Sequence, residues 1–469
     1  MRNHFFYLAI LILTPGLLLK AEIRLPSILA NHVVLQQNSN TKIWGWSAPG
    51  EKILIQTSWN NRLDSTVGSR DANWIFNIQT PAAGGPYTIT LTGENKIILE
   101  DIMIGEVWVC SGQSNMEWGY RQGLKDIRDE LPTCYNSAIR FFNIQKVTSD
   151  HFQENCPGQW AVCDSNSLKS FSAIGYFFGK KLNAELKVPI GLINDNWGGT
   201  PAEVWTPSHV ISENPRLEEA ARQLKAYNWW PYLPGKTFNA MIAPITNFSI
   251  AGALWYQGEG NTAYPYAYSE LLNAMVDSWR KAWDKNFPFY YVQIAPFHYG
   301  NHNIGALIRE EQTKSMNHGG MGMVVISDLV DDTTNIHPKN KKDPALRLAA
   351  WALANTYHRE GIKYSSPFFK SITVNKGKAV IAFDTGGQDL MCRDKKVTEL
   401  YIAGADKTFY PAEASIDHNQ LIVWSKQVPI PVAVRYGFSN AGIGNLFNKD
   451  GLPVCPFRTD NWEVDVSAN

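Results

Sequence analysis

The sequence lacks three features that would point to particular protein classes: an excess of charge of one sign, the cysteine and histidine spacing of a structural metal site, and an internal repeat. Lysine plus arginine and aspartate plus glutamate each number 43 among 469 residues. A balanced chain gives no electrostatic reason to expect nucleic acid or an anionic membrane surface as a partner. Because no ligand spacing typical of zinc occurs, we expect no structural metal site.

Long apolar runs are absent beyond the first 21 residues. These residues have the order of a secretory signal: Arg2, then an apolar stretch from Phe5 to Leu19, then Ala21 before the expected cleavage. The alternative is a membrane anchor, but the stretch is shorter than the roughly 20 apolar residues that a spanning helix needs. We therefore expect a signal peptide over residues 1–21, no membrane span, and a secreted or periplasmic protein.

The six cysteines fit an oxidising compartment, where disulfides persist. Cys134, Cys156 and Cys163 lie close enough in sequence to suggest a local bridge, although a sequence does not reveal the pairing.

The chain is organised as three regions after the signal. Residues 22–103 contain short period-two segments between turn residues, which indicates an N-terminal antiparallel β domain. Residues 104–360 alternate apolar strands with amphipathic helices. Residues 361–469 return to a β pattern, with a hairpin expected at residues 375–377.

The central region predicts an α/β fold. Helices are expected along Ile174 to Leu186, along 272–283, and after Asp343, where Asp343 is the expected N-cap and Pro344 the first helical residue. The expected strands are 106–110, 190–193, 251–256, 289–294 and 323–326. Such alternation implies a parallel sheet covered on both faces, with ligands bound beyond the carboxyl ends of its strands.

The first loop at such a strand end, residues 110–116, contains Ser114. A serine nucleophile needs a base and donors for the oxyanion, and a position between strand and helix aims backbone N–H groups at the reacting carbonyl. Capping of the helix is the commoner role for a serine at this position. Ser114 is therefore a candidate nucleophile that needs support from other loops.

Two further loops contain candidate donors. Gly198 and Gly199 allow backbone N–H groups to approach a ligand closely. Gln257 has a side-chain amide that donates, and Glu259 could fix its orientation. An ordinary tight turn and an inert polar loop are the alternative interpretations.

His337 is the candidate base. Its ordinary pKa of about 6.5 suits proton transfer at neutral pH, so we expect the rate to fall below that pH. It lies in a loop between the last expected strand and the helix after Asp343, whereas most of the 10 histidines must be bystanders.

Together these motifs resemble the sialate O-acetylesterase family of SGNH hydrolases. The resemblance rests on residues 112–116, 197–200 with Glu203 and Trp205, 255–259, and 336–338. It extends over nearly all of the mature chain through residues 33–37, 43–46, 238–244, 445–448, 451–453 and 456–458. The resemblance implies an SGNH-hydrolase (flavodoxin-like) parallel-sheet core with N-terminal and C-terminal β-rich domains. It further implies a serine esterase that uses no metal or other cofactor and acts on O-acetylated carbohydrate, with O-acetylated sialic acid as the expected substrate.

The resemblance also implies roles for individual residues. Ser114 would be the nucleophile and His337 the base. The oxyanion donors would be the backbone N–H of Ser114, the backbone N–H of Gly198 or Gly199, and the Gln257 side chain. The substrate-pocket candidates are Gln113, Asn115, Trp118, Trp197, Glu259 and Arg309, the last as a partner for a sialate carboxylate.

The sequence departs from the SGNH pattern at two places. The loop that usually supplies an asparagine donor reads Glu259-Gly260-Asn261 here, which assigns that role to Gln257. Many of these enzymes carry aspartate three residues before the histidine, where this chain has Thr334. The third member of a triad therefore stays open among Asp328, Asp331, Asp332 and a backbone carbonyl. We expect a Ser-His dyad supported by other groups.

Two other functions fit parts of the pattern. The same core would serve an esterase for acetylated xylan or another plant polysaccharide. A non-catalytic carbohydrate-binding protein would use aromatic rings as stacking groups, here Trp118, Trp205, Trp229 and Trp230.

Overall fold

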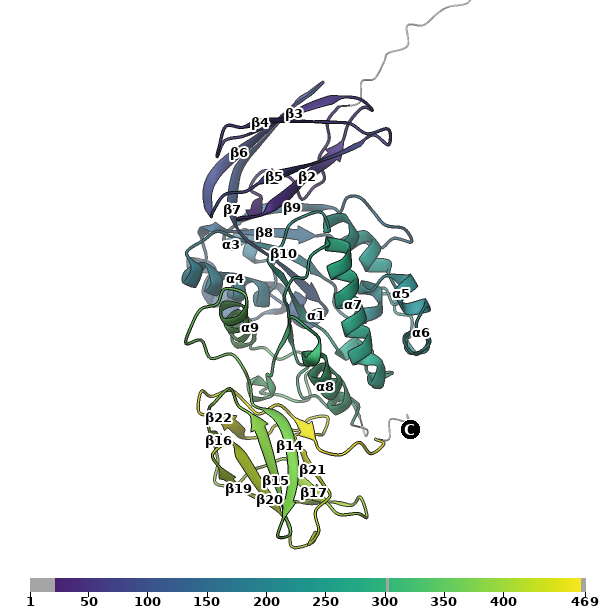
Figure 1. Ribbon diagram of the computed structural model, residues 1–469, viewed down its shortest axis with the longest axis vertical. Helices are drawn as coiled ribbons and strands as arrows, with labels where there is room; N and C mark the ends of the chain where they lie inside the picture. Colours follow the sequence, from purple (N-terminus) through teal and green to yellow (C-terminus); the bar gives the residue numbers. More distant parts are fainter. Residues whose placement is uncertain (1–21, 301–302, 465–469) are drawn as a thin grey trace, which may run out of the picture.

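The computed structural model describes residues 22–300 and 303–464, arranged as three bodies along one axis (Figure 1). An α/β body lies between a β body at the N-terminal end and a second β body at the C-terminal end. The predicted signal over residues 1–21 lies outside the described residues. Within the described ranges, no helix has the length and apolar character needed to cross a membrane.

The N-terminal body consists of two antiparallel layers. One is the pair β2 with β5, and the other contains β3, β4, β6 and the first part of β7, with β1 added in parallel. The strands are β1 (Val34–Gln36), β2 (Asn40–Trp46), β3 (Lys52–Thr57), β4 (Leu63–Val67), β5 (Asn73–Gln79), β6 (Gly84–Thr92) and β7 (Lys96–Gly112).

Strand β7 belongs to two bodies. Its first part pairs with β6, and its second part, from Glu106 to Gly112, pairs with strands of the central sheet. The boundary expected between residues 103 and 104 falls inside this strand. A single rigid strand therefore connects the N-terminal body to the sheet that positions the candidate site.

The central sheet is largely parallel. In spatial order its strands are β13 (Met321–Val324), β12 (Phe289–Val292), β11 (Gly252–Tyr256), β7, β10 (Ile190–Asn196), β8 (Asn136–Ile144) and β9 (Gly158–Cys163). Strand β9 pairs antiparallel with β8 at one edge. Apart from that edge pair, the strands follow the 2-1-3-4-5 order of flavodoxin-like sheets, with β7 at the switch point where ligands bind. The expected parallel sheet is confirmed, and Ser114 lies just beyond the carboxyl end of β7.

Helices cover both faces of this sheet, because successive strand residues point to opposite sides. Trp108 packs in the cluster shared with α4 and α9, and its neighbour Val109 packs in the cluster shared with α7. Burying each large apolar side chain contributes about 1.5–3 kcal/mol. The helices are α1 (Ser114–Glu117), α2 (Lys125–Glu130), α3 (Ser165–Leu168), α4 (Ala173–Leu186), α5 (Ser208–Ser212), α6 (Pro215–Arg222), α7 (Tyr268–Trp283), α8 (Ile304–Lys314) and α9 (Lys342–Asn355).

The expected cap of the last helix is wrong. Helix α9 begins at Lys342, so Asp343 lies within its first turn. The Asn340 side chain accepts a hydrogen bond from the Asp343 backbone N–H at 3.0 Å and donates to the Asp343 carboxylate at 2.8 Å. A side chain three residues earlier than expected thus serves the helix start.

The C-terminal body is a two-layered β structure, and the hairpin expected at residues 375–377 is confirmed because β14 and β15 pair antiparallel around it. One sheet has the order β14-β15-β20-β19, another β18-β17-β21-β23, and β16 pairs with β22. The strands are β14 (Phe368–Asn375), β15 (Lys378–Asp384), β16 (Leu390–Cys392), β17 (Leu400–Ala403), β18 (Phe409–Pro411), β19 (Glu413–Asp417), β20 (Gln420–Trp424), β21 (Ala433–Tyr436), β22 (Leu446–Asn448) and β23 (Phe457–Arg458).

The cysteines do not form the expected local bridge. All six are free thiols, all within the described residues. The Cys163 thiol instead donates to the Cys134 carbonyl at 3.1 Å, and burial raises the pKa of Cys163 to about 12.

Candidate active site

Ser114 is the first residue of the short helix that follows β7. The chain turns at Gly112, whose φ is +133° and whose missing Cβ would lie 2.3 Å from the Tyr256 carbonyl oxygen, so only glycine fits there. Gln113 is then the extended residue before α1. The close approach of β7 to β11 therefore places the Ser114 hydroxyl at the carboxyl edge of the sheet.

His337 reaches this hydroxyl from a loop 223 residues further along the chain. Its Nε2 lies 2.9 Å from Oγ of Ser114, a hydrogen-bond distance. The imidazole stacks on the Trp118 ring with centroids 4.2 Å apart and planes 17° apart. The Asn335 side chain accepts a hydrogen bond from the His337 backbone N–H at 2.9 Å. These contacts fix the ring against the serine.

The environment keeps the His337 imidazole neutral. Burial, and to a smaller extent the nearby Lys341 ammonium, together lower its pKa from 6.5 to about 4. A neutral imidazole is the form that accepts a proton from a serine.

Among residues 22–300 and 303–464, no carboxylate forms a hydrogen bond with the His337 ring. Both oxygens of Asp328 accept from Arg347 at 2.7 Å, which holds this carboxylate in a partly buried ion pair. Asp332 accepts from the backbone and hydroxyl of Thr334, and Asp331 is exposed. None of the three aspartates is therefore a third triad member in this structure.

Asn115 joins the serine loop to the histidine loop. Its amide donates to Glu259 at 2.6 Å and to the Ile336 carbonyl at 3.1 Å, and its carbonyl oxygen accepts from the Lys341 ammonium at 2.6 Å. Burial raises the pKa of Glu259 and lowers that of Lys341. The Ile336 contact ties the residue before His337 directly to the residue after Ser114.

Gln257 does not point at the serine, contrary to the expectation. Its amide donates to the Thr200 carbonyl at 3.2 Å and to the Asn261 side chain at 2.7 Å, and its oxygen accepts from the Tyr268 hydroxyl. The side chain is fully buried. Both donor hydrogens are thus used inside the loop, and an oxyanion role for Gln257 is wrong.

Within the described residues, Gln113 has an unpaired amide donor, which Gln257 lacks. Its oxygen accepts from the backbone N–H groups of Gly260 at 3.0 Å and Gly258 at 3.4 Å, which fixes the orientation of the amide. Its Nε2 donates to no group in the described part of the chain, and it is not among the buried unpaired atoms there. Gln113 also lines the cleft that contains Ser114.

The two glycines of the second loop differ. The Gly198 backbone N–H donates to the Glu117 carboxylate at 2.6 Å, and the other oxygen of Glu117 accepts from Lys146 at 2.6 Å. The Gly199 N–H forms no hydrogen bond with any described residue, and Gly199 lines the cleft. Gly199 is therefore free to donate, whereas Gly198 is free only when Glu117 turns away.

The Ser114–His337 pair opens into a cleft of roughly 1090 Å³. Beside the pair, its walls include polar side chains and the aromatic rings of Tyr227, Trp230, Tyr232 and Tyr299. Glu259 lines the cleft, although it is mostly buried. Trp197 does not line it; its indole donates to the Trp229 carbonyl at 3.1 Å.

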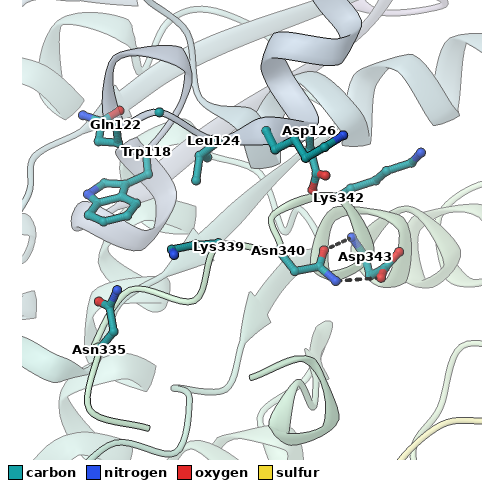
Figure 2. A pocket seen from close by; sticks show the side chains of 11 residues that line it. Trp118, Gln122, Leu124, Asp126, Asn335, Lys339, Asn340, Lys342 and Asp343 are labelled. Atoms are coloured by element: carbon teal, nitrogen blue, oxygen red, sulfur yellow. Dashed lines mark hydrogen bonds between the residues drawn. The ribbon is translucent and has the colours of Figure 1, made fainter. Parts of the chain in front are cut away.

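A second cleft, of roughly 590 Å³, is also lined by Trp118 (Figure 2). Asn335 and Lys339 line it from the histidine loop, and Asp126 and Lys342 lie farther along it. Trp118 lines both clefts and so forms the wall between them.

One arginine candidate, Arg309, and one tryptophan candidate, Trp205, line neither cleft. Arg309 is 1% exposed and donates to the backbone carbonyls of Ser439 and Asn440, which connects α8 to the C-terminal body. Its assignment to a sialate carboxylate is therefore wrong. Trp205 is fully buried and donates to the Thr200 hydroxyl at 3.0 Å, so it is no stacking platform.

Sequence reasoning missed Lys341 and Glu117. Lys341 lies four residues after His337, but its contact with Asn115 joins positions 226 residues apart. Glu117 lies one helical turn after Ser114, a spacing that does bring side chains near each other and could have identified it.

Comparison with known proteins gives a consistent result. The family model described as "Carbohydrate esterase, sialic acid-specific acetylesterase" matches residues 104–357, more than half of the chain. Sialate O-acetylesterase from Homo sapiens is 26% identical, with 80% of this chain and 79% of that protein covered. The Mus musculus sialate O-acetylesterase is also 26% identical, with 89% of each covered.

A solved structure resembles nearly the whole chain. It is described as a novel carbohydrate acetylesterase from Xanthomonas citri, with a TM-score of 0.86, 35% sequence identity, and coverage of 94% of this chain and 100% of that one. The family match and this likeness together cover the sheet, the serine loop and the histidine loop. The chain therefore belongs to the carbohydrate esterase family of sialic acid-specific acetylesterases, and it is an esterase.

Proposed function

We propose that the protein is a secreted serine esterase with an SGNH-hydrolase core, which removes O-acetyl groups from carbohydrate through an acetyl-Ser114 intermediate. The observation that carries the proposal is the 2.9 Å contact between Ser114 Oγ and His337 Nε2 at the switch point of the sheet. A carbohydrate-binding protein without activity has no need of this pair.

In the first half of the reaction, Ser114 Oγ attacks the acetyl carbonyl carbon while His337 Nε2 takes the hydroxyl proton. The carbonyl oxygen becomes an oxyanion, which the free Ser114 N–H, the Gly199 N–H and the Gln113 amide stabilise. The bond between carbonyl carbon and sugar oxygen then breaks, and that oxygen takes the proton from His337. Water attacks the acetyl-serine by the same steps in reverse and releases acetate.

Neutral groups do the work that a triad carboxylate does elsewhere. The Trp118 ring supports one face of the imidazole, Asn335 fixes its backbone, and Asn115 holds the preceding carbonyl. This arrangement supports a Ser-His dyad.

The substrate we favour is O-acetylated sialic acid, because the human and mouse relatives are named sialate O-acetylesterase. Lys225, the one lysine or arginine among the described residues that line the cleft, would take the sialate carboxylate in place of Arg309. An acetylated plant polysaccharide is the second candidate, because the cleft extends beyond the serine over several aromatic rings.

The test is acetate release by the wild-type protein and by Ser114→Ala. We expect the wild type to hydrolyse a chromogenic acetate ester and Ser114→Ala to lose at least about 1000-fold in kcat/KM with an unchanged circular dichroism spectrum. Turnover retained by Ser114→Ala would refute the mechanism. Comparing acetate release from O-acetylated sialic acid and acetylxylan then decides between the two substrates.

A further inference from the structure

An aromatic segment stands at the mouth of the catalytic cleft. It lies between α6 and Phe238 and contains Tyr227, Trp229 and Trp230. Trp229 is 80% exposed and Tyr227 is 53% exposed. Leaving large rings in water forgoes the free energy of burying them, so a group of exposed rings beside a cleft points to a ligand that covers them.

Two of these rings form an ordered surface. Tyr227 and Trp230 stack with centroids 4.6 Å apart and planes 30° apart, and both line the cleft that contains Ser114 and His337. Because Trp230 also lies against Gly199, the outer face of the Tyr227 ring is the free apolar surface of the pair.

The segment is fixed to the catalytic loops. The Trp197 indole donates to the Trp229 carbonyl at 3.1 Å. Trp230 lies directly over Gly199, where an added Cβ would come within 2.3 Å of the indole ring, and Gly199 has a φ of +85°. The aromatic surface therefore rests on the same glycine turn that supplies the candidate oxyanion donor, and its distance from Ser114 is set by the fold.

The chemistry of the surface fits one class of ligand. A pyranose ring has an apolar C–H face that covers an aromatic ring, and hydroxyl groups at its rim that need hydrogen-bond partners. Gln223, Lys225 and Thr262 line the same cleft and supply such partners. A purely apolar ligand that covered these groups would leave them without hydrogen-bond partners, which disfavours its binding.

We infer that Tyr227 and Trp230 form a subsite for a sugar next to the acetylated one, so the substrate is a glycan chain rather than a free monosaccharide. This inference rests on the proposed function. It assigns the substrate length, which neither the Ser-His pair nor the family match specifies.

The experiment compares a short and a long substrate in Tyr227→Ala. The readout is kcat/KM for an acetylated oligosaccharide divided by kcat/KM for a chromogenic acetate ester. We expect this ratio to fall about three- to tenfold, the effect of one aromatic contact, with the loss in KM. Tyr227→Phe should restore the ratio because it keeps the ring. Tyr135→Ala is the matched control, since Tyr135 is 73% exposed and outside the cleft lining.

Binding to the Ser114→Ala protein separates this inference from the proposed function. Titration with deacetylated oligosaccharides should give an affinity that rises from the monosaccharide to the trisaccharide and falls when Tyr227→Ala is added. If the wild type cleaves neither ester, the proposed function fails, and the titration still tests the subsite. An affinity independent of chain length, or a ratio unchanged in Tyr227→Ala, would overturn the inference.

Discussion

The two clefts that meet at Trp118 are both large enough for a sugar, yet they differ in chemistry. The larger one holds a hydroxyl and an imidazole at 2.9 Å, unpaired N–H donors and a wall of aromatic rings. The smaller one holds charged side chains, among them Asp126, Lys339 and Lys342, and no serine or histidine among its described lining residues (Figure 2). Because both clefts have room for a sugar, the convergence of nucleophile, base and donors is what identifies the larger one as the site.

The difference follows from the sheet. The larger cleft lies beyond the carboxyl ends of β7, β10 and β11, where loops from three strands converge. The smaller cleft lies between the segment after α1 and the start of α9, so it borders the site on one side only. Trp118 belongs to both, with its ring stacked on His337.

After Ser114→Ala, the largest expected effect within the larger cleft concerns Gln113. Gln113→Ala removes an amide whose N–H groups are unpaired among the described residues and which lines the cleft with Ser114; if this amide stabilises the oxyanion as proposed, kcat should fall by roughly 100-fold or more. Gln257→Ala is the matched control, because its amide donates within the loop. Its loss should lower the melting temperature and change kcat less than Gln113→Ala does. Steady-state kinetics and thermal unfolding of both variants measure this contrast, and a larger kcat loss in Gln257→Ala would reverse the assignment.

The second expected effect is on the pH profile. Activity requires neutral His337, and its lowered pKa of about 4 moves the loss of activity to lower pH than the 6.5 expected from the sequence. At pH 5 we expect about 90% of maximal kcat/KM, whereas an unshifted histidine would leave about 3%. Circular dichroism over the same range checks that the fold persists, and a midpoint near 6.5 would show that the imidazole is not desolvated as described.

The smallest expected effect belongs to the smaller cleft. Lys339 has no ion-pair partner in the described part of the chain, and it lines only the smaller cleft. Lys339→Ala should therefore change kcat/KM for a chromogenic acetate ester by less than about twofold, as expected for an exposed charge outside the site. A tenfold loss would mean that the two clefts act as one.

The sequence predicts the parallel sheet and its loops well, because buried strands and helices leave periodic apolar patterns. Ser114 and His337 could be paired from sequence because carboxyl ends of parallel strands meet at one edge. The direction of individual polar side chains could not be predicted from the sequence. Gln113 and Gln257 both follow strands and both carry amides. The Gln113 oxygen accepts from Gly260 and leaves its N–H groups unpaired in the described part of the chain, whereas the Gln257 N–H groups donate within the loop, one of them to Thr200.

Partners distant in sequence explain the remaining errors. Asp328 lies near His337 along the chain, yet Arg347 holds both its oxygens. Arg309 lies on a helix beside the site, yet its guanidinium faces Ser439 in the C-terminal body. No local pattern encodes these contacts, because each depends on how separately formed elements pack.

The most direct measurement is labelling by a serine-directed phosphonate, followed by peptide mass mapping of the wild type and of His337→Ala. A nucleophilic Ser114 activated by His337 should be labelled alone among the serines in the wild type, and its labelling rate should fall at least about 100-fold in His337→Ala. Labelling at another serine, or an equal rate in the two proteins, would contradict the Ser114–His337 pair.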